Sequence, residues 1–184
     1  MNKEDLVAHI QCAKVISANK FDVYNYLTNP ECLAELLKDH IEVTWQNPGI
    51  EVKQGCEFLF LMSRFGIEQP VRFVVDRLVI GNQMTYRQVS GVYARLIHTM
   101  KFEEHGQNET LVTDLVDYEM PFGILGRLAD DFYGRADLKR ILETRLERAA
   151  EKFASEDSVN PAKAADDSGE ASSGEGSENN LQAN

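Results

Sequence analysis

The chain lacks the long apolar runs and the basic clusters that mark membrane and nucleic-acid-binding proteins. Its longest purely apolar run, Phe58–Met62, is far short of the about 20 residues that a membrane helix needs. No stripe of Lys and Arg is present that would neutralise phosphates. The opening residues, MNKEDLVAHIQC, lack the apolar segment of a secretory signal. We therefore expect a cytoplasmic protein with no membrane span and no nucleic-acid partner.

Residues suited to metal or cofactor binding are few and scattered. The three cysteines lie in apolar patterns, as reduced core residues do: Cys12, Cys32 and Cys56. The four histidines show no pairing with each other or with cysteine at ligand spacing: His9, His40, His98 and His105. No Gly-rich phosphate loop and no G-x-S-x-G nucleophile motif occurs. We expect no metal site and no cofactor.

Length and charge predict one domain with an acidic tail. A chain of 184 residues has room for a single domain with a real core. Its net charge is -11, and residues 155–184 hold seven acidic residues and one lysine, which leaves only -5 on the rest. The tail is too poor in apolar side chains to offset the entropy of ordering. We expect a domain over residues 1–154 and a disordered tail over residues 155–184.

Hydrophobic periodicity predicts an α+β protein with antiparallel strands. An alternating run over Asp5–Ile16 precedes two short helices, the first from a cap at Ser17 or Asn19 and the second over residues 31–37. Six more alternating runs follow, separated by turn residues: 41–45, 56–64, 71–78, 83–90, 93–103 and 110–118. Strands this close leave no room for crossover helices, so the seven-stranded sheet should be antiparallel.

After Pro121 the apolar spacing becomes helical and continues to Phe153, with Leu125, Leu128 and Phe132 in its first part. Gly134 is expected to kink this helix. The predicted order is β-αα-β6-α. A single long helix would then cover the apolar face of the sheet.

The last two strands place polar side chains among apolar ones. One face of the first holds Leu96, His98, Met100 and Phe102, and one face of the second holds Val112, Asp114, Val116 and Tyr118. A turn near Gly106 sets Met100 opposite Asp114 and Phe102 opposite Val112, with His98 diagonal to Asp114. Ligand pockets are typically apolar walls with a few convergent polar groups.

Two features of this wall have alternative interpretations. A tight turn at Ser90-Gly91 would turn Arg87 inward and favour a carboxylate-bearing or phenolic ligand, whereas a bulge would turn Tyr86 inward and favour a more neutral one. His98 and Asp114 either satisfy each other as buried polar groups or serve as an acid/base pair, with His98 transferring the proton.

Four segments resemble one known superfamily. ISANKFDVYNYLTNPECL, TYRQVSG, LIHTMKF and TLVTDLVDYEMPFGILG are similar in order and spacing to the START-like, or SRPBCC, superfamily, in its polyketide cyclase/dehydrase and coenzyme Q-binding branch. The resemblance covers about residues 5–153. It implies a helix-grip fold, in which a seven-stranded antiparallel sheet wraps a long C-terminal helix around a cavity for apolar ligands. No arrangement of cysteines and histidine resembles the iron site of the ring-hydroxylating members.

The expected function is carriage or sensing of a small hydrophobic ligand such as a lipid, isoprenoid or polyketide. A polyketide cyclase or dehydratase that uses His98 and Asp114 as acid/base is the alternative, so enzymatic activity stays open. A regulatory role for the acidic tail is a third possibility. The expected ligand-binding residues are Tyr86, Leu96, His98, Met100, Phe102, Val112, Asp114, Val116, Tyr118, Leu128 and Phe132.

Overall fold

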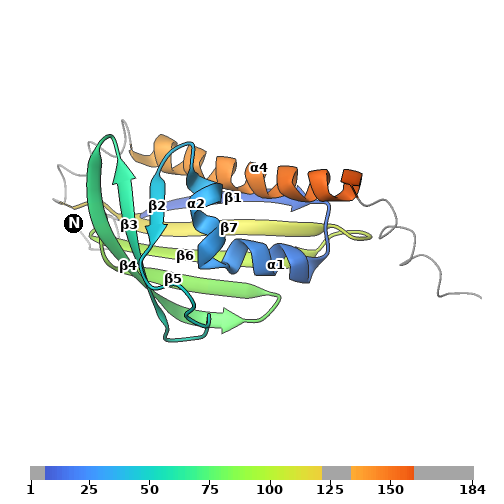
Figure 1. The fold of residues 1–184 in the computed structure, drawn as a ribbon, viewed down its shortest axis with the longest axis horizontal. Helices are drawn as coiled ribbons and strands as arrows, with labels where there is room; N and C mark the ends of the chain where they lie inside the picture. Colours follow the sequence, from blue (N-terminus) through green and yellow to red (C-terminus); the bar gives the residue numbers. More distant parts are fainter. Residues whose placement is uncertain (1–6, 122–133, 160–184) are drawn as a thin grey trace, which may run out of the picture.

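A seven-stranded antiparallel sheet curls around one long helix in the computed structural model, which describes residues 7–121 and 134–159 (Figure 1). The strands are β1 (Ala8–Ile16), β2 (Glu42–Trp45), β3 (Glu57–Arg64), β4 (Ile67–Val79), β5 (Gln83–Ser90), β6 (Arg95–Glu104) and β7 (Thr110–Glu119). They lie in the order β1-β7-β6-β5-β4-β3-β2. The helical elements are α1 (Lys20–Thr28), the 3-10 turn η2 (Pro30–Cys32), α2 (Leu33–Leu37) and α4 (Arg135–Val159). The predicted class, sheet and element order are confirmed.

Two asparagines start the helical segment between β1 and β2. The Asn19 side chain accepts a hydrogen bond from the Phe21 backbone N–H at 2.8 Å and caps α1. The Asn29 side chain accepts one from the Glu31 N–H at 3.0 Å, and Pro30 stands first in η2, where a missing N–H costs nothing. Asn29 thus stands both at the end of α1 and at the start of η2. The chain can therefore fold α1 and α2 across one end of the sheet.

The curvature of the sheet comes from its turns and register shifts. Phe65 and Gly66 both have positive φ, 53° and 76°, and form the two-residue connection between β3 and β4. The pairing of β4 with β5 shifts twice, between Arg72 and Phe73 and between Val75 and Arg77. Such irregularities increase local twist and bend the strand. The concave face that results is the one that α4 covers.

Within the run of six strands, the starts of β4 and β6 differ from the predicted ones by two residues or more. β4 begins at Ile67 instead of residue 71 and runs through Pro70, which faces Leu61 of β3 at a point beyond the last β5 partner. Proline is tolerated there because this stretch of β4 has a partner on one side only. β6 begins at Arg95 instead of residue 93, since Tyr93 lies in the connection, where its carbonyl accepts from the Gln88 side chain at 2.7 Å.

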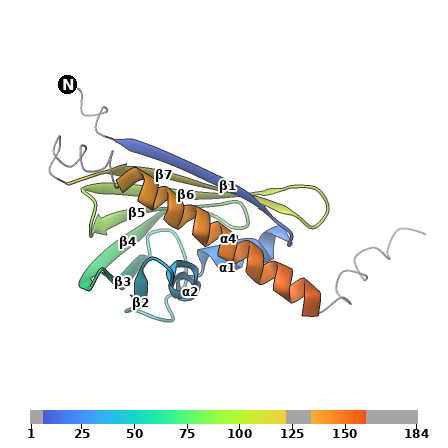
Figure 2. The same cartoon turned by 90° about the horizontal axis from the view of Figure 1, so that it is seen from above.

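The long helix α4 lies across the concave face and packs most closely on β1 (Figure 2). Its buried face carries the apolar side chains Leu138, Ile141, Leu142, Leu146, Ala149 and Phe153. The helix continues to Val159, so the first residues of the tail predicted as disordered are helical. Extending an existing helix costs little, and the Ser155 hydroxyl donates to the Lys152 carbonyl. No helix among the described residues is long and apolar enough to span a membrane.

Candidate functional site

An internal cavity of about 390 Å³ lies between the concave face of the sheet and the helices. Protein interiors contain few voids larger than one water molecule. A water molecule takes up roughly 30 Å³ in the liquid, so this cavity has the volume of about a dozen waters. It is therefore a built feature of the fold and falls within the range of small-molecule sites.

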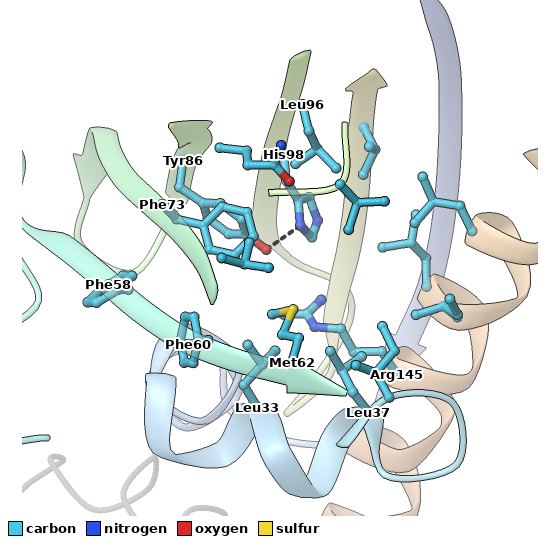
Figure 3. Close-up of a pocket in the computed structure, with 18 of the residues that line it drawn as sticks. Leu33, Leu37, Phe58, Phe60, Met62, Phe73, Tyr86, Leu96, His98 and Arg145 are labelled. Atoms are coloured by element: carbon cyan, nitrogen blue, oxygen red, sulfur yellow. Dashed lines mark hydrogen bonds between the residues drawn. The ribbon is translucent and has the colours of Figure 1, made fainter. Parts of the chain in front are cut away.

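Apolar side chains from both layers line most of the cavity. Figure 3 shows this lining, with Leu33 and Leu37 from α2, Phe58, Phe60 and Met62 from β3, and Phe73 from β4. The α4 side contributes Leu138, Ile141 and Leu142. Rings follow one another along the sheet, with centroid separations of 5.2 Å for Phe73 and Tyr86 and 5.0 Å for Tyr86 and His98. The lining suits a molecule with a large apolar surface and at least one ring.

A chain of polar side chains interrupts this apolar lining on the sheet side. Tyr86 of β5 and His98 of β6 face each other across the two strands, and the Tyr86 hydroxyl lies 2.6 Å from His98 Nδ1 (Figure 3). His98 Nε2 lies 3.1 Å from Asp114 Oδ1, in a contact that is off the line of an ideal hydrogen bond. Both His98 and Asp114 are buried, and His98 borders the cavity whereas Asp114 lies behind it.

Arg145 of α4 completes the chain from the other layer. Its Nη1 donates to Asp114 Oδ2 at 2.7 Å, and its Nη2 donates to the Leu27 carbonyl at 3.1 Å and contacts Met100 Sδ at 2.9 Å. The guanidinium is only 3% exposed and borders the cavity. One side chain thus holds together β7, the end of α1 and β6.

The charge of Asp114 follows from these neighbours. Burial alone would raise the pKa of its carboxyl group, but the Arg145 charge, and after it His98, more than offset this effect. The pKa of Asp114 therefore lies below its ordinary value, and the group is a carboxylate at neutral pH. Arg145 is always cationic, so the two charges cancel inside the core.

Solved structures match this chain, while no family model and no curated protein sequence does. The di-domain ARO/CYC StfQ from the steffimycin biosynthetic pathway is 18% identical over 85% of this chain and 53% of its own, with a TM-score of 0.65. Major latex-like protein 151 from Panax ginseng is 14% identical over 80% of this chain and 98% of its own, with a TM-score of 0.61. Protein CV1439 from Chromobacterium violaceum is 17% identical over 78% of this chain and 95% of its own, with a TM-score of 0.59.

The chain has the helix-grip fold, which it shares with these solved structures. The fold that the resemblance of the four sequence segments implied is thereby confirmed. At these low identities the likeness describes the fold, because one fold hosts many unrelated activities. The functional site of this helix-grip protein has to be argued from its own residues.

The structure brings together some of the predicted site residues and separates others. Met100 pairs with Asp114 and Phe102 with Val112, as predicted, and Tyr86 lies opposite His98. Tyr86 therefore points inward, whereas Arg87 is exposed and pairs with Asp76 at 3.0 Å. The predicted residues that line the cavity are Tyr86, Leu96, His98, Met100 and Val116. Phe102, Val112, Asp114 and Tyr118 are buried on the same face without lining it, and Leu128 and Phe132 lie outside the described residues.

Sequence reasoning missed Arg145 as a site residue. A signal was present, because Arg145 follows Ile141 by four positions and Leu142 by three, on the apolar face of the helix. A charged side chain at such a position needs a buried partner. Asp114 was the available carboxylate on the facing strand.

One end of the cavity is rimmed by exposed apolar side chains and a surface ion pair. Phe65 and Ile67 of the β3–β4 hairpin are 87% and 69% exposed, and Val92 beside them is 45% exposed. Arg64 forms two contacts with Asp137 at the start of α4, at 2.6 and 2.8 Å. Residues 64–69 contribute four side chains to the lining, whereas residues 47–55 line no part of the cavity.

The Tyr86 hydroxyl should reveal its burial through the pH dependence of stability. Desolvation raises the pKa of Tyr86 from 10.0 to about 12, with smaller and opposite effects of Arg145 and Asp114. Its stabilising contribution is present below pH 10 and is lost as the pH rises towards 12. Chemical denaturation of the wild type between these pH values should therefore show a steeper fall in unfolding free energy than Tyr86→Phe. The extra slope approaches about 1.4 kcal/mol per pH unit. If the unfolding free energies of the two proteins fell equally with pH, the burial of the Tyr86 hydroxyl would be contradicted.

Proposed function

We propose that this helix-grip protein binds a small apolar molecule, such as a lipid, isoprenoid or polyketide, inside its cavity. The observation that carries the proposal is the cavity of about 390 Å³ with its largely apolar lining. Burying apolar surface there removes it from water and stabilises the complex by about 25 cal/mol for each Å². Carriage or sensing of the ligand needs no more than this.

The mouth of the cavity supports the same proposal. Phe65, Ile67 and Val92 are exposed and all line the cavity, and grouped apolar side chains of this kind are typical of ligand-binding grooves. At the rim they give an apolar molecule a continuous path from the surface to the interior. The named neighbour StfQ is an ARO/CYC of a biosynthetic pathway, which agrees with a helix-grip protein handling an organic molecule.

The binding proposal predicts the effect of filling the cavity. Leu33 is half-buried on α2 and borders the cavity. In Leu33→Trp the indole ring should therefore occupy much of the cavity volume without being forced into the packed core. Titration with a hydrophobic fluorescent dye should show at least a tenfold weaker affinity than for the wild type. The control Val15→Trp adds the same ring at an exposed position of β1 and should leave the affinity unchanged. Equal dye binding by Leu33→Trp and the wild type would contradict the proposal.

A chemical step on the bound molecule is the second candidate, favoured by the contact of His98 with Asp114. In this hypothesis His98 transfers a proton to or from the ligand, and Asp114 orients its ring from behind the cavity wall. Positioned proton transfer of this kind accelerates reactions by about 10² to 10⁴-fold. A cyclase or dehydratase of polyketides would use such a group.

Mass spectrometry can test the chemical step on whatever molecule co-purifies with the protein. After long incubation, the wild type should convert this molecule to a dehydrated or isomeric product, whereas His98→Gln should leave it intact. An unchanged molecule with the wild-type protein would favour binding alone.

A further inference from the structure

The polar chain beside the cavity has a direction, and Asp114 sets it. A carboxylate can only accept hydrogen bonds. Arg145 donates to one oxygen, Oδ2, and the other, Oδ1, makes no hydrogen bond and lies 3.1 Å from His98 Nε2. A bare Nε2 would direct its lone pair at a carboxylate oxygen 3.1 Å away, and the two would repel each other. Arg145 already balances the Asp114 charge, so a second proton on the His98 ring would leave an unmatched positive charge in the core. The single proton of the ring therefore resides on Nε2.

The tautomer of His98 decides the role of Tyr86. A neutral imidazole carries one N–H, so Nδ1 is an acceptor when Nε2 is protonated. The 2.6 Å contact between Tyr86 and His98 Nδ1 is then a hydrogen bond donated by the phenol. The phenol proton then lies on the His98 side of Tyr86, and the ring proton lies on the side of His98 that is closest to Asp114. Polar groups that are linked in this way polarise one another in a low-dielectric core. The Tyr86 proton is used within the protein.

What remains for a ligand is the Tyr86 oxygen as an acceptor. Tyr86 borders the cavity, and its ring lies between Phe73 and His98 in the line of aromatic side chains (Figure 3). We propose that the ligand is a neutral ring compound with a hydroxyl group, an aromatic or alicyclic alcohol or phenol, which donates a hydrogen bond to the Tyr86 oxygen. The inference rests on the proposed binding function and specifies its ligand class.

Charge within the cavity wall argues against an anionic ligand. Among the described residues, the charged side chains that line the cavity are Arg145 and Arg64, and each already faces a carboxylate, Asp114 and Asp137 respectively. A ligand carboxylate would lose its hydration and find no free counter-charge among the described residues. A hydroxyl group meets the Tyr86 acceptor without adding charge to the core.

Four naphthalene probes of similar shape separate these contributions. 2-Naphthol carries a donor, 2-methoxynaphthalene an acceptor only, 2-ethylnaphthalene neither, and 2-naphthoate a negative charge at pH 7.5. Dissociation constants are measured by calorimetry for the wild type, for Tyr86→Phe and for Tyr24→Phe. Tyr24 is a buried tyrosine outside the cavity lining and serves as the matched control. Thermal melting confirms that each variant is folded.

Tyr86→Phe should weaken the binding of 2-naphthol by about five- to tenfold, which is the effect of one lost hydrogen bond. The dissociation constants of the methoxy and ethyl compounds should change by less than about twofold. Tyr24→Phe should change none of them. 2-Naphthoate should bind the wild type more weakly than 2-naphthol. An equal loss for the three neutral probes, a selective loss of 2-methoxynaphthalene, or tighter binding of 2-naphthoate would overturn the inference. Failure of every probe to bind the wild type would instead contradict the proposed function itself.

Discussion

The buried ion pair between Asp114 and Arg145 is the interaction on which the rest of the site depends. It joins the middle of β7 to the covering helix α4, and the same guanidinium also binds the end of α1 through the Leu27 carbonyl. Removing one partner of such a pair typically costs about 3–5 kcal/mol, because the other charge is left buried and uncompensated. The pair therefore keeps sheet and helices in one arrangement. It also keeps a carboxylate charged at a place where burial alone would favour its protonated form.

That fixed carboxylate gives the cavity its chemical character. Without it, His98 and Tyr86 could exchange the roles of donor and acceptor, and the cavity wall would present either kind of group to a ligand. With it, the wall is largely apolar, carries no unmatched charge among the described residues, and offers an oriented acceptor, the Tyr86 oxygen, beside a line of aromatic rings. An arrangement of this kind selects a molecule by its shape and by its hydrogen-bonding group. Carriage and sensing require such selection, and a chemical step would use the same chain of side chains.

Much of the fold could be predicted because its signals are local. Alternating apolar positions identified the strands, turn residues separated them, and the absence of crossover segments implied antiparallel pairing. The register of β6 and β7 followed from one turn, so the proximity of His98 and Asp114 could also be predicted. The sequence left open whether Tyr86 or Arg87 points inward, because this depends on how many residues between Ser90 and Arg95 are unpaired between the two strands. Arg145 was missed because its role depends on contacts with residues that are distant in the sequence. Periodicity alone places position 145 on the core-facing side of the helix and does not reveal these partners.

The direction of the hydrogen-bond chain is the central claim, and the tautomer of His98 tests it most directly. Long-range proton–nitrogen correlation spectra of the ¹⁵N-labelled protein at pH 7.5 report which ring nitrogen carries the proton, and His98→Gln assigns the signals. We predict a protonated Nε2 and a bare Nδ1, with the Asp114 carboxylate behind it. A ring protonated on Nδ1 alone, or on both nitrogens, would contradict the account, because the Tyr86 hydroxyl would then be free to donate into the cavity.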